Sequence, residues 1–282
     1  MNNEFTSINR GKNRIEKKFN QLKAQNKAGL VTFLTAGDPD PDTAQRILNG
    51  LPEAGADIIE LGMPFSDPMA DGPAIQLANL RALGNGMTLQ KTLDQVASFR
   101  TLDNETPIVL MGYYNPIHYY GTQRFIDDAI EAGVDGLIIV DLPPEEDEEL
   151  CHPCMTAGLN WIRLATPTAD DERLSKILKH SSGFIYYVSI AGVTGTHSAQ
   201  QSDTSEAVAR IRKQTDLPVA VGFGIKTADH VANTVAVADA AVVGSALINT
   251  IAEGLEAQLS TDEIVTNLHA FVAELARGTI KN

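Results

Sequence analysis

Residues 57–73 read DIIELGMPFSDPMADGP, and the rest of the 282-residue chain is organised around this stretch. Its first part, residues 58–61, is apolar and β-branched except for Glu60, a pattern typical of a buried strand. An ionised carboxylate is costly among apolar side chains, so burial is expected to raise the pKa of Glu60. The strand leads into a proline-bearing loop with two further acids, Asp67 and Asp71. A carboxyl group at a strand end beside such a loop is typical of a general acid–base pair; a structural ion pair with turn-forming acids is the alternative.

Charge and composition narrow the classes of partner. The formal net charge is −14, whereas a nucleic-acid or anionic-membrane surface needs clustered cations. A small phosphorylated ligand remains compatible, because a few backbone N–H groups are enough to hold it. Apolar runs are shorter than a membrane span, and the polar N-terminus has no signal-peptide core. We therefore expect a soluble, cytoplasmic protein without a nucleic-acid or membrane partner.

The cysteines, Cys151 and Cys154, have the spacing of a redox pair. A redox-active pair normally opens a helix whose N-terminus stabilises the thiolate, but here an acidic run precedes it and would raise the thiol pKa values. A zinc site would need two more ligands nearby, and only His152 is adjacent. The six histidines show no ligand spacing in the sequence. We expect no metal site and interpret the cysteines as incidental.

Short apolar runs alternate with helical patterns along the chain. Strands are expected near residues 30–34, 58–61, 108–111, 136–140, 161–164, 184–189, 218–221 and 240–243. An additional amphipathic helix is expected within residues 8–26, and extra helices after the second and eighth strands. Eight strand-then-helix units are typical of a (β/α)8 TIM barrel in the α/β class. The alternative, a doubly wound sheet, lacks support because no dinucleotide-type glycine-rich turn follows the first strand. Without a linker or composition shift, residues 1–282 are expected to form a single domain.

In such barrels, functional groups lie on the loops that follow the strands. The glycine-bearing segments VGFGIKT and VGSALI follow the seventh and eighth strands, where barrels often bind phosphate. Tight helix–strand connections are the alternative explanation of these glycines. The small, polar loop at residues 189–206 is expected to be either a mobile lid or an ordinary connection.

Six segments, in order, resemble the tryptophan synthase α subunit family: VTFLTAGDPD, IELGMPFSDPMADGPAIQ, VLMGYYNPI, GLIIVDLPPEE, FIYYVSIAGVTG and GFGI. The resemblance implies a (β/α)8 barrel that cleaves indole-3-glycerol phosphate into indole and glyceraldehyde 3-phosphate in a retro-aldol reaction of tryptophan biosynthesis. It also implies that this chain has no cofactor and belongs to an α2β2 heterotetramer. In that assembly, a β subunit carries pyridoxal phosphate and receives the indole.

The resemblance also implies residue roles. Glu60 matches the general acid–base residue, and Asp71 matches the second catalytic acid. The other matching positions fall into three groups: substrate-binding Phe33, Tyr113, Ile138, Tyr186, Thr194 and Phe223; phosphate-binding Gly195, Gly224, Gly244 and Ser245; and Pro64 and Asp67 at the β-subunit interface. Two departures from some family members are Ile190, where others carry Arg, and Asn79, where Ser is common. Neither is expected to touch the acid–base pair.

Three alternatives to a partnered lyase are open. A stand-alone indole-releasing lyase would share every catalytic residue. A catalytically silent barrel that only activates a partner is disfavoured by Glu60 and Asp71, because an idle carboxylate in an apolar strand is a liability. A phosphosugar isomerase barrel would share the phosphate loops but would not need the ELGxPFSDP segment.

Overall fold

The computed structural model describes residues 14–189, 197–222 and 224–280. Its strands form one parallel sheet in the order β5-β4-β3-β2-β1-β9-β8-β7-β6. The strands are β1 (Gly29–Thr35), β2 (Ile58–Gly62), β3 (Ile108–Gly112), β4 (Gly136–Ile139), β5 (Asn160–Trp161), β6 (Arg163–Ala165), β7 (Ile185–Val188), β8 (Val219–Gly222) and β9 (Ala240–Val243). β1 pairs with both β2 and β9, so the chain's first and last strands are neighbours in a nearly closed TIM barrel, as predicted.

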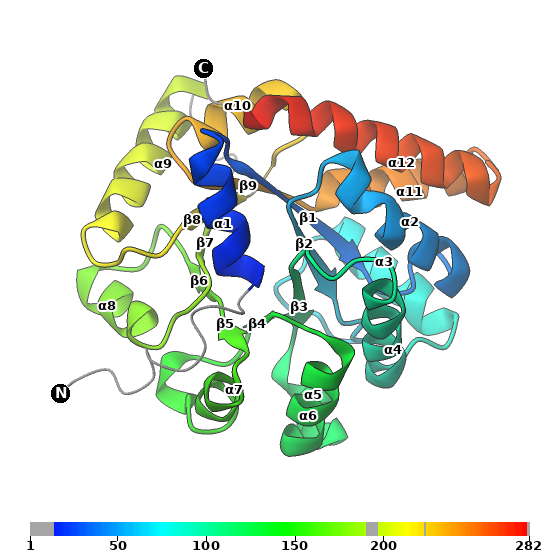
Figure 1. Ribbon diagram of the computed structural model, residues 1–282, viewed down its shortest axis with the longest axis horizontal. Coiled ribbons are helices and arrows are strands. Elements are labelled where there is room, and N and C mark those ends of the chain that lie inside the picture. Colours follow the sequence, from blue (N-terminus) through cyan, green and yellow to red (C-terminus); the bar gives the residue numbers. More distant parts are fainter. Residues whose placement is uncertain (1–13, 190–196, 223, 281–282) are drawn as a thin grey trace.

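Helices surround this ring of strands (Figure 1). They are α1 (Arg14–Ala24), α2 (Pro41–Ala54), α3 (Pro73–Gly84), α4 (Leu89–Arg100), α5 (Tyr114–Tyr120), α6 (Thr122–Ala132), α7 (Cys151–Ala157), α8 (Asp171–Lys179), α9 (His197–Arg212), α10 (Ala228–Val235), α11 (Ser245–Glu256) and α12 (Thr261–Ala276). Short 3-10 turns lie at Pro144–Glu146 and Arg277–Thr279. The extra helices after the second and eighth expected strands are α4 and α12. None of the helices in the described residues is long and apolar enough to cross a membrane.

The expected fifth strand is broken into two pieces. β5 pairs with β4, whereas β6 pairs with β7, and Ile162 between them belongs to neither strand. The Ile162 side chain is buried in the cluster that fills the barrel. The single strand predicted over residues 161–164 is therefore corrected to two short strands, of which one pairs with β4 and the other with β7.

Alternate strand residues point into the barrel and form its inner core. This core includes Val31, Ile58 and Val109 from β1, β2 and β3, together with Phe184, which directly precedes β7. Helix α1 lies across one end of the ring (Figure 1), with Ile15 and Phe19 packed on the same cluster. The Phe19 and Phe184 ring centroids are 5.8 Å apart. α1 thereby closes the end at which the strands begin, as its predicted apolar stripe requires, and the opposite end is left for function.

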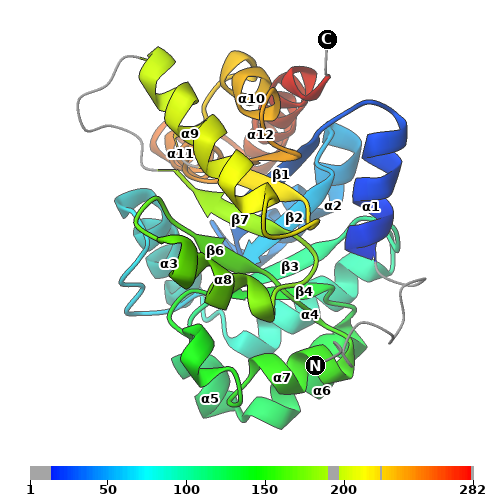
Figure 2. The same ribbon diagram turned by 90° about the vertical axis from the view of Figure 1, so that its left-hand side faces the viewer.

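One local expectation is corrected. Helix α9 begins at His197, so the second half of the predicted loop 189–206 is helical, while 190–196 lie outside the described residues. The aromatic segment after β3 also forms a helix, α5. Figure 2 shows α9 and α8 side by side on the outside of the strands. The correction arises because the polar composition of residues 197–204 concealed the start of a helix.

Candidate active site

Glu60 lies on β2 and points into the barrel. Its neighbour across the sheet is Phe33 on β1 in one direction and Val109 on β3 in the other. The side chain is fully buried, and neither carboxylate oxygen has a hydrogen-bond partner among the described residues. Burial raises the pKa of Glu60 from 4.5 to about 8. The carboxyl group is therefore mostly protonated at neutral pH, as a general acid requires. Because its pKa is close to neutrality, the same group can also act as a base once it has released its proton.

Tyr186 on β7 lies close enough to Glu60 for the charge of the carboxylate to affect the pKa of the tyrosine hydroxyl. Burial, and secondarily the charge of Glu60, raises the pKa of Tyr186 well above its usual value, so the phenol stays neutral. Its hydroxyl lies over Gly222 on β8, where an added Cβ would be 2.6 Å from the oxygen. Tyr186 thus presents a neutral hydroxyl between the acid and the glycine-bearing end of β8.

Asp71 stands at the end of the loop that follows β2, two residues before helix α3. It is partly buried, and its Oδ2 accepts a hydrogen bond of 3.3 Å from Asn79 Nδ2. Burial raises the pKa of Asp71, while hydrogen bonds from Tyr113 and Asn79 oppose the rise. The Tyr113 hydroxyl also accepts a bond of 3.0 Å from the Ala70 backbone N–H. Tyr113 and Asn79 therefore hold the loop acid in place.

Asn79 was expected not to touch the acid–base pair, and that expectation was wrong. The side chain is buried on the first turns of α3, where its amide reaches back to the Asp71 carboxylate. Separation by eight residues across a loop–helix junction concealed this contact. The start of α3 at Pro73 could have indicated it, because a helix beginning there places Asn79 on the side that faces the loop.

Apolar side chains enclose the space around Glu60. Phe33 and Ile138 are both buried, on β1 and β4. The Phe33 ring lies over Gly62, where an added Cβ would be 2.7 Å from its Cζ. Phe65, in the loop after β2, stacks at a tilt on Tyr113 with ring centroids 5.5 Å apart. These rings provide a flat, apolar lining on the β1–β4 side of the barrel end.

The part of this end that follows β8 and β9, next to Phe33, carries the glycines predicted to bind phosphate. Gly224 has a φ of +70°, a left-handed conformation that favours glycine. Gly244 is the N-cap of α11 and provides no side chain, so the helix begins with exposed Ser245. The N-terminus of a helix favours negative charge, which makes this an electrostatically suitable place for an anion.

Three predicted positions, Thr194, Gly195 and Phe223, lie outside the described residues. The two predicted interface residues lie in the loop after β2: Pro64 is half-buried and Asp67 is exposed. The same region exposes Met69, whose side chain is 79% accessible.

The cysteine pair lies away from these groups, on α7. Both thiols are free and buried. Burial raises the pKa of Cys154 to about 12 and raises that of Cys151 as well, the latter with a contribution from its neighbour. The pair does open a helix, but its thiols are held in the unreactive protonated form.

Comparisons with known proteins identify the family of this chain. The family model described as "Tryptophan synthase alpha chain" matches residues 19–279. A tryptophan synthase subunit alpha structure from Legionella pneumophila str. Paris is 41% identical, with a TM-score of 0.87, over 95% of this chain and 98% of that one. A tryptophan synthase structure from M. tuberculosis is 33% identical, with a TM-score of 0.83, over 94% and 99% of the two chains. The protein therefore belongs to the tryptophan synthase alpha chain family of lyases.

Proposed function

We propose that Glu60 and Asp71 are the acid–base pair with which this chain performs the family's reaction, the cleavage of indole-3-glycerol phosphate into indole and glyceraldehyde 3-phosphate. The observation that carries the proposal is the fully buried Glu60 carboxyl group, unpartnered among the described residues and with its pKa raised to about 8. A structural ion pair, the alternative for Glu60, would require a cationic partner, and its pKa would then fall.

Glu60 serves two proton transfers in this proposal. The protonated carboxyl group first donates its proton to the indole ring carbon that bears the glycerol chain, which forms an indolenine. The resulting carboxylate then takes the proton of the adjacent glycerol hydroxyl as the carbon–carbon bond breaks. The bonding electrons return to the ring, so indole and the aldehyde leave and Glu60 is protonated again. A pKa near neutrality suits both directions of transfer.

Asp71 stabilises the intermediate. Protonation of the ring carbon places positive charge on the indole nitrogen, and a carboxylate that accepts the N–H bond stabilises this charge. Hydrogen bonds from Asn79 and Tyr113 favour the ionised form of Asp71. Phe33, Tyr113, Ile138 and Phe223 would line the indole pocket, and Tyr186 would contact the substrate.

The phosphate group would bind at the start of α11. Gly224, Gly244 and Ser245 offer backbone N–H groups and a helix N-terminus, with Gly195 as a fourth contributor. This binding depends on dipoles more than on salt bridges. It fixes one end of the substrate, so the indole end is directed toward Glu60. Thr194, within the predicted lid loop, matches the family's lid threonine and would contact Asp71 when that loop closes.

We further infer that the chain works with a pyridoxal-phosphate-bearing β subunit in an α2β2 assembly and has no cofactor of its own. The family membership supports this, and the exposed loop with Pro64, Asp67 and Met69 offers a contact surface. The test below distinguishes this partnered lyase from two alternatives, a stand-alone lyase and a catalytically silent partner. The cytoplasmic location and the single-domain organisation expected from the sequence stay predictions.

The test is indole release from indole-3-glycerol phosphate by the purified chain, with and without a β subunit. We expect activity that the β subunit enhances, and its near-complete loss in Glu60→Gln with ligand binding retained. Full activity without the partner would favour the stand-alone lyase. A folded wild-type chain without activity in either mixture, or a Glu60→Gln variant with appreciable turnover, would contradict the proposed acid–base role.

A further inference from the structure

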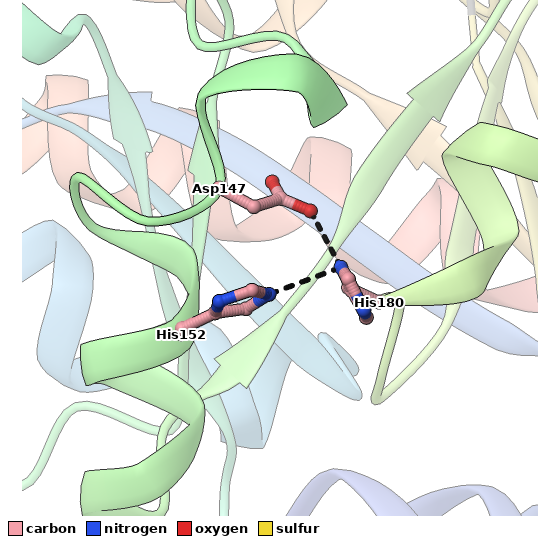
Figure 3. Close-up of side chains that lie close together, drawn as sticks. All are labelled: Asp147, His152 and His180. Carbon is pink, nitrogen blue, oxygen red and sulfur yellow. Dashed lines mark hydrogen bonds and ion pairs between the residues drawn. The ribbon is translucent and has the colours of Figure 1, made fainter. Parts of the chain in front are cut away.

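Three side chains that the sequence separates meet at one point outside the active site. Asp147 lies in the loop before α7, His152 in the first turn of α7, and His180 directly after α8 (Figure 3). One ligand atom from each lies within 4.8 Å of the other two. His180 Nδ1 is 2.7 Å from Asp147 Oδ2 and 3.2 Å from His152 Nε2.

Three atoms that can each donate an electron pair to a metal, one on each side chain, lie around a single hydrogen-bonding hydrogen in this cluster. His152 Nδ1 lies 3.1 Å from a Glu148 carboxylate oxygen, to which its N–H donates. In the tautomer that carries its hydrogen on Nδ1, the His152 ring presents the lone pair of Nε2 to His180. A single hydrogen on His180 Nδ1 is therefore shared between the Asp147 carboxylate and the His152 nitrogen. When that hydrogen shifts to Nε2 of the same ring, three lone pairs face one point.

Neighbouring groups orient these donors as the outer contacts of a metal site do. The other oxygen of Asp147 accepts a hydrogen bond from the buried Arg163 guanidinium, which also donates to the Leu142 carbonyl oxygen at 2.7 Å. Glu148 holds the far nitrogen of His152. Ligating histidines and carboxylates are typically fixed in this way, each through its second polar atom.

We propose that Asp147, His152 and His180 bind one divalent transition-metal ion, with zinc as the best fit. Zinc prefers imidazole nitrogen and carboxylate oxygen at about 2 Å in a tetrahedron, which places ligand atoms about 3.3 Å apart. The contacts of 2.7 and 3.2 Å are close to that spacing, so only small side-chain movements are needed. Both histidines remain about one-quarter exposed, which leaves a fourth position for water.

Local charge is compatible with the ion. Asp147 supplies one negative charge, which Arg163 partly offsets, and Glu148 adds another beside His152. The ion would connect the loop after β4 to the end of α8, so its effect would be on the stability of this side of the barrel.

The test uses the full chain, freed of metal with a chelator, and zinc chloride or cobalt chloride as the probe. We expect one equivalent of zinc by calorimetry, visible absorption of four-coordinate cobalt, and a higher Tm with zinc. His152→Gln and His180→Gln should each weaken zinc binding at least about tenfold, whereas His118→Gln, at an exposed histidine on α5, should not.

Metal-free circular dichroism verifies that each variant is folded, and Asp147 is left intact because its removal would leave buried Arg163 unpaired. Indole release should be unaffected by the chelator, which separates this site from the acid–base proposal. Absence of stoichiometric zinc binding by the wild-type chain would overturn the inference and leave a hydrogen-bonded histidine pair. Zinc binding by both histidine variants that is as tight as that of the wild-type chain would overturn it as well.

Discussion

Replacement of Glu60 by glutamine should stabilise the protein while it removes turnover. The pKa of Glu60 rises from 4.5 to about 8 on folding because the carboxylate loses its hydration. Between those two values the folded chain keeps the proton and the unfolded chain releases it, so the stability of the wild-type chain falls as pH rises. Relative to low pH, ionisation of Glu60 lowers the unfolding free energy of the wild-type chain by about 3 kcal/mol at pH 7 and by about 5 kcal/mol above pH 8.

Glutamine has nearly the same shape and no titrating proton. Its buried amide adds an offset in stability that does not vary with pH. The difference in unfolding free energy between Glu60→Gln and wild type should therefore grow by about 4 kcal/mol from pH 5 to pH 9, in favour of the variant. All other titrating groups are common to both chains and cancel in this difference.

The assay is urea unfolding of both chains across this pH range, followed by circular dichroism and analysed by linear extrapolation. Glu53→Gln, at an exposed position on α2, is the matched control and should show no such trend. A constant difference between Glu60→Gln and wild type from pH 5 to pH 9 would refute the reasoning. It would mean that Glu60 is hydrated or paired in solution and has an ordinary pKa.

Three further predictions follow from other contacts. Gly224→Asp should raise the KM for indole-3-glycerol phosphate through like-charge repulsion, whereas Gly224→Asn, which tolerates the φ of +70° and is neutral, should raise it far less; equal KM values in steady-state kinetics would exclude phosphate from this loop. Asn79→Ala removes a hydrogen bond that lowers the pKa of Asp71, so the acidic limb of the kcat/KM profile should move to higher pH; an unmoved limb would mean that Asp71 ionisation does not limit the reaction. Arg100→Leu leaves the buried Asp135 carboxylate with Arg14 as its one cationic partner among the described residues, and it should lower the unfolding free energy in urea by about 3 kcal/mol. Arg46→Leu, at the exposed pair with Asp262, should lower it by less than about 1 kcal/mol; similar losses would show that burial does not determine how much these ion pairs stabilise the fold.

Much of the fold was open to prediction because its signals are local. The buried strands read as continuous apolar runs, and seven of the eight expected strands lie where the sequence places them. The exception, residues 161–164, shows what local pattern omits. Ile162 is as apolar as its neighbours, and only the closure of the ring decides that it leaves the ladder to fill the barrel interior.

In the candidate site, too, some features could be predicted from local sequence and others depend on tertiary contacts. Glu60 was evident because a single carboxylate interrupts an apolar strand, and an isolated polar group in a buried run has few structural explanations. The link between Asn79 and Asp71 was missed because it depends on how α3 leaves the loop. Helix α9 was expected to begin near residue 205 because the polar composition before that point resembles a loop, whereas the helix begins at His197.

By itself, the sequence determined the repeating strand–helix order, the end of the barrel at which the acids lie, and the family. These features follow from period and motif, which act over a few residues. The sequence also predicted that Glu60 is buried, but the tertiary structure alone decided that this burial is complete, that the ladder breaks at Ile162, and that His152 meets His180, 28 residues apart. Desolvation and long-range contact depend on which surfaces pack together, and that is fixed only when the ring of strands closes.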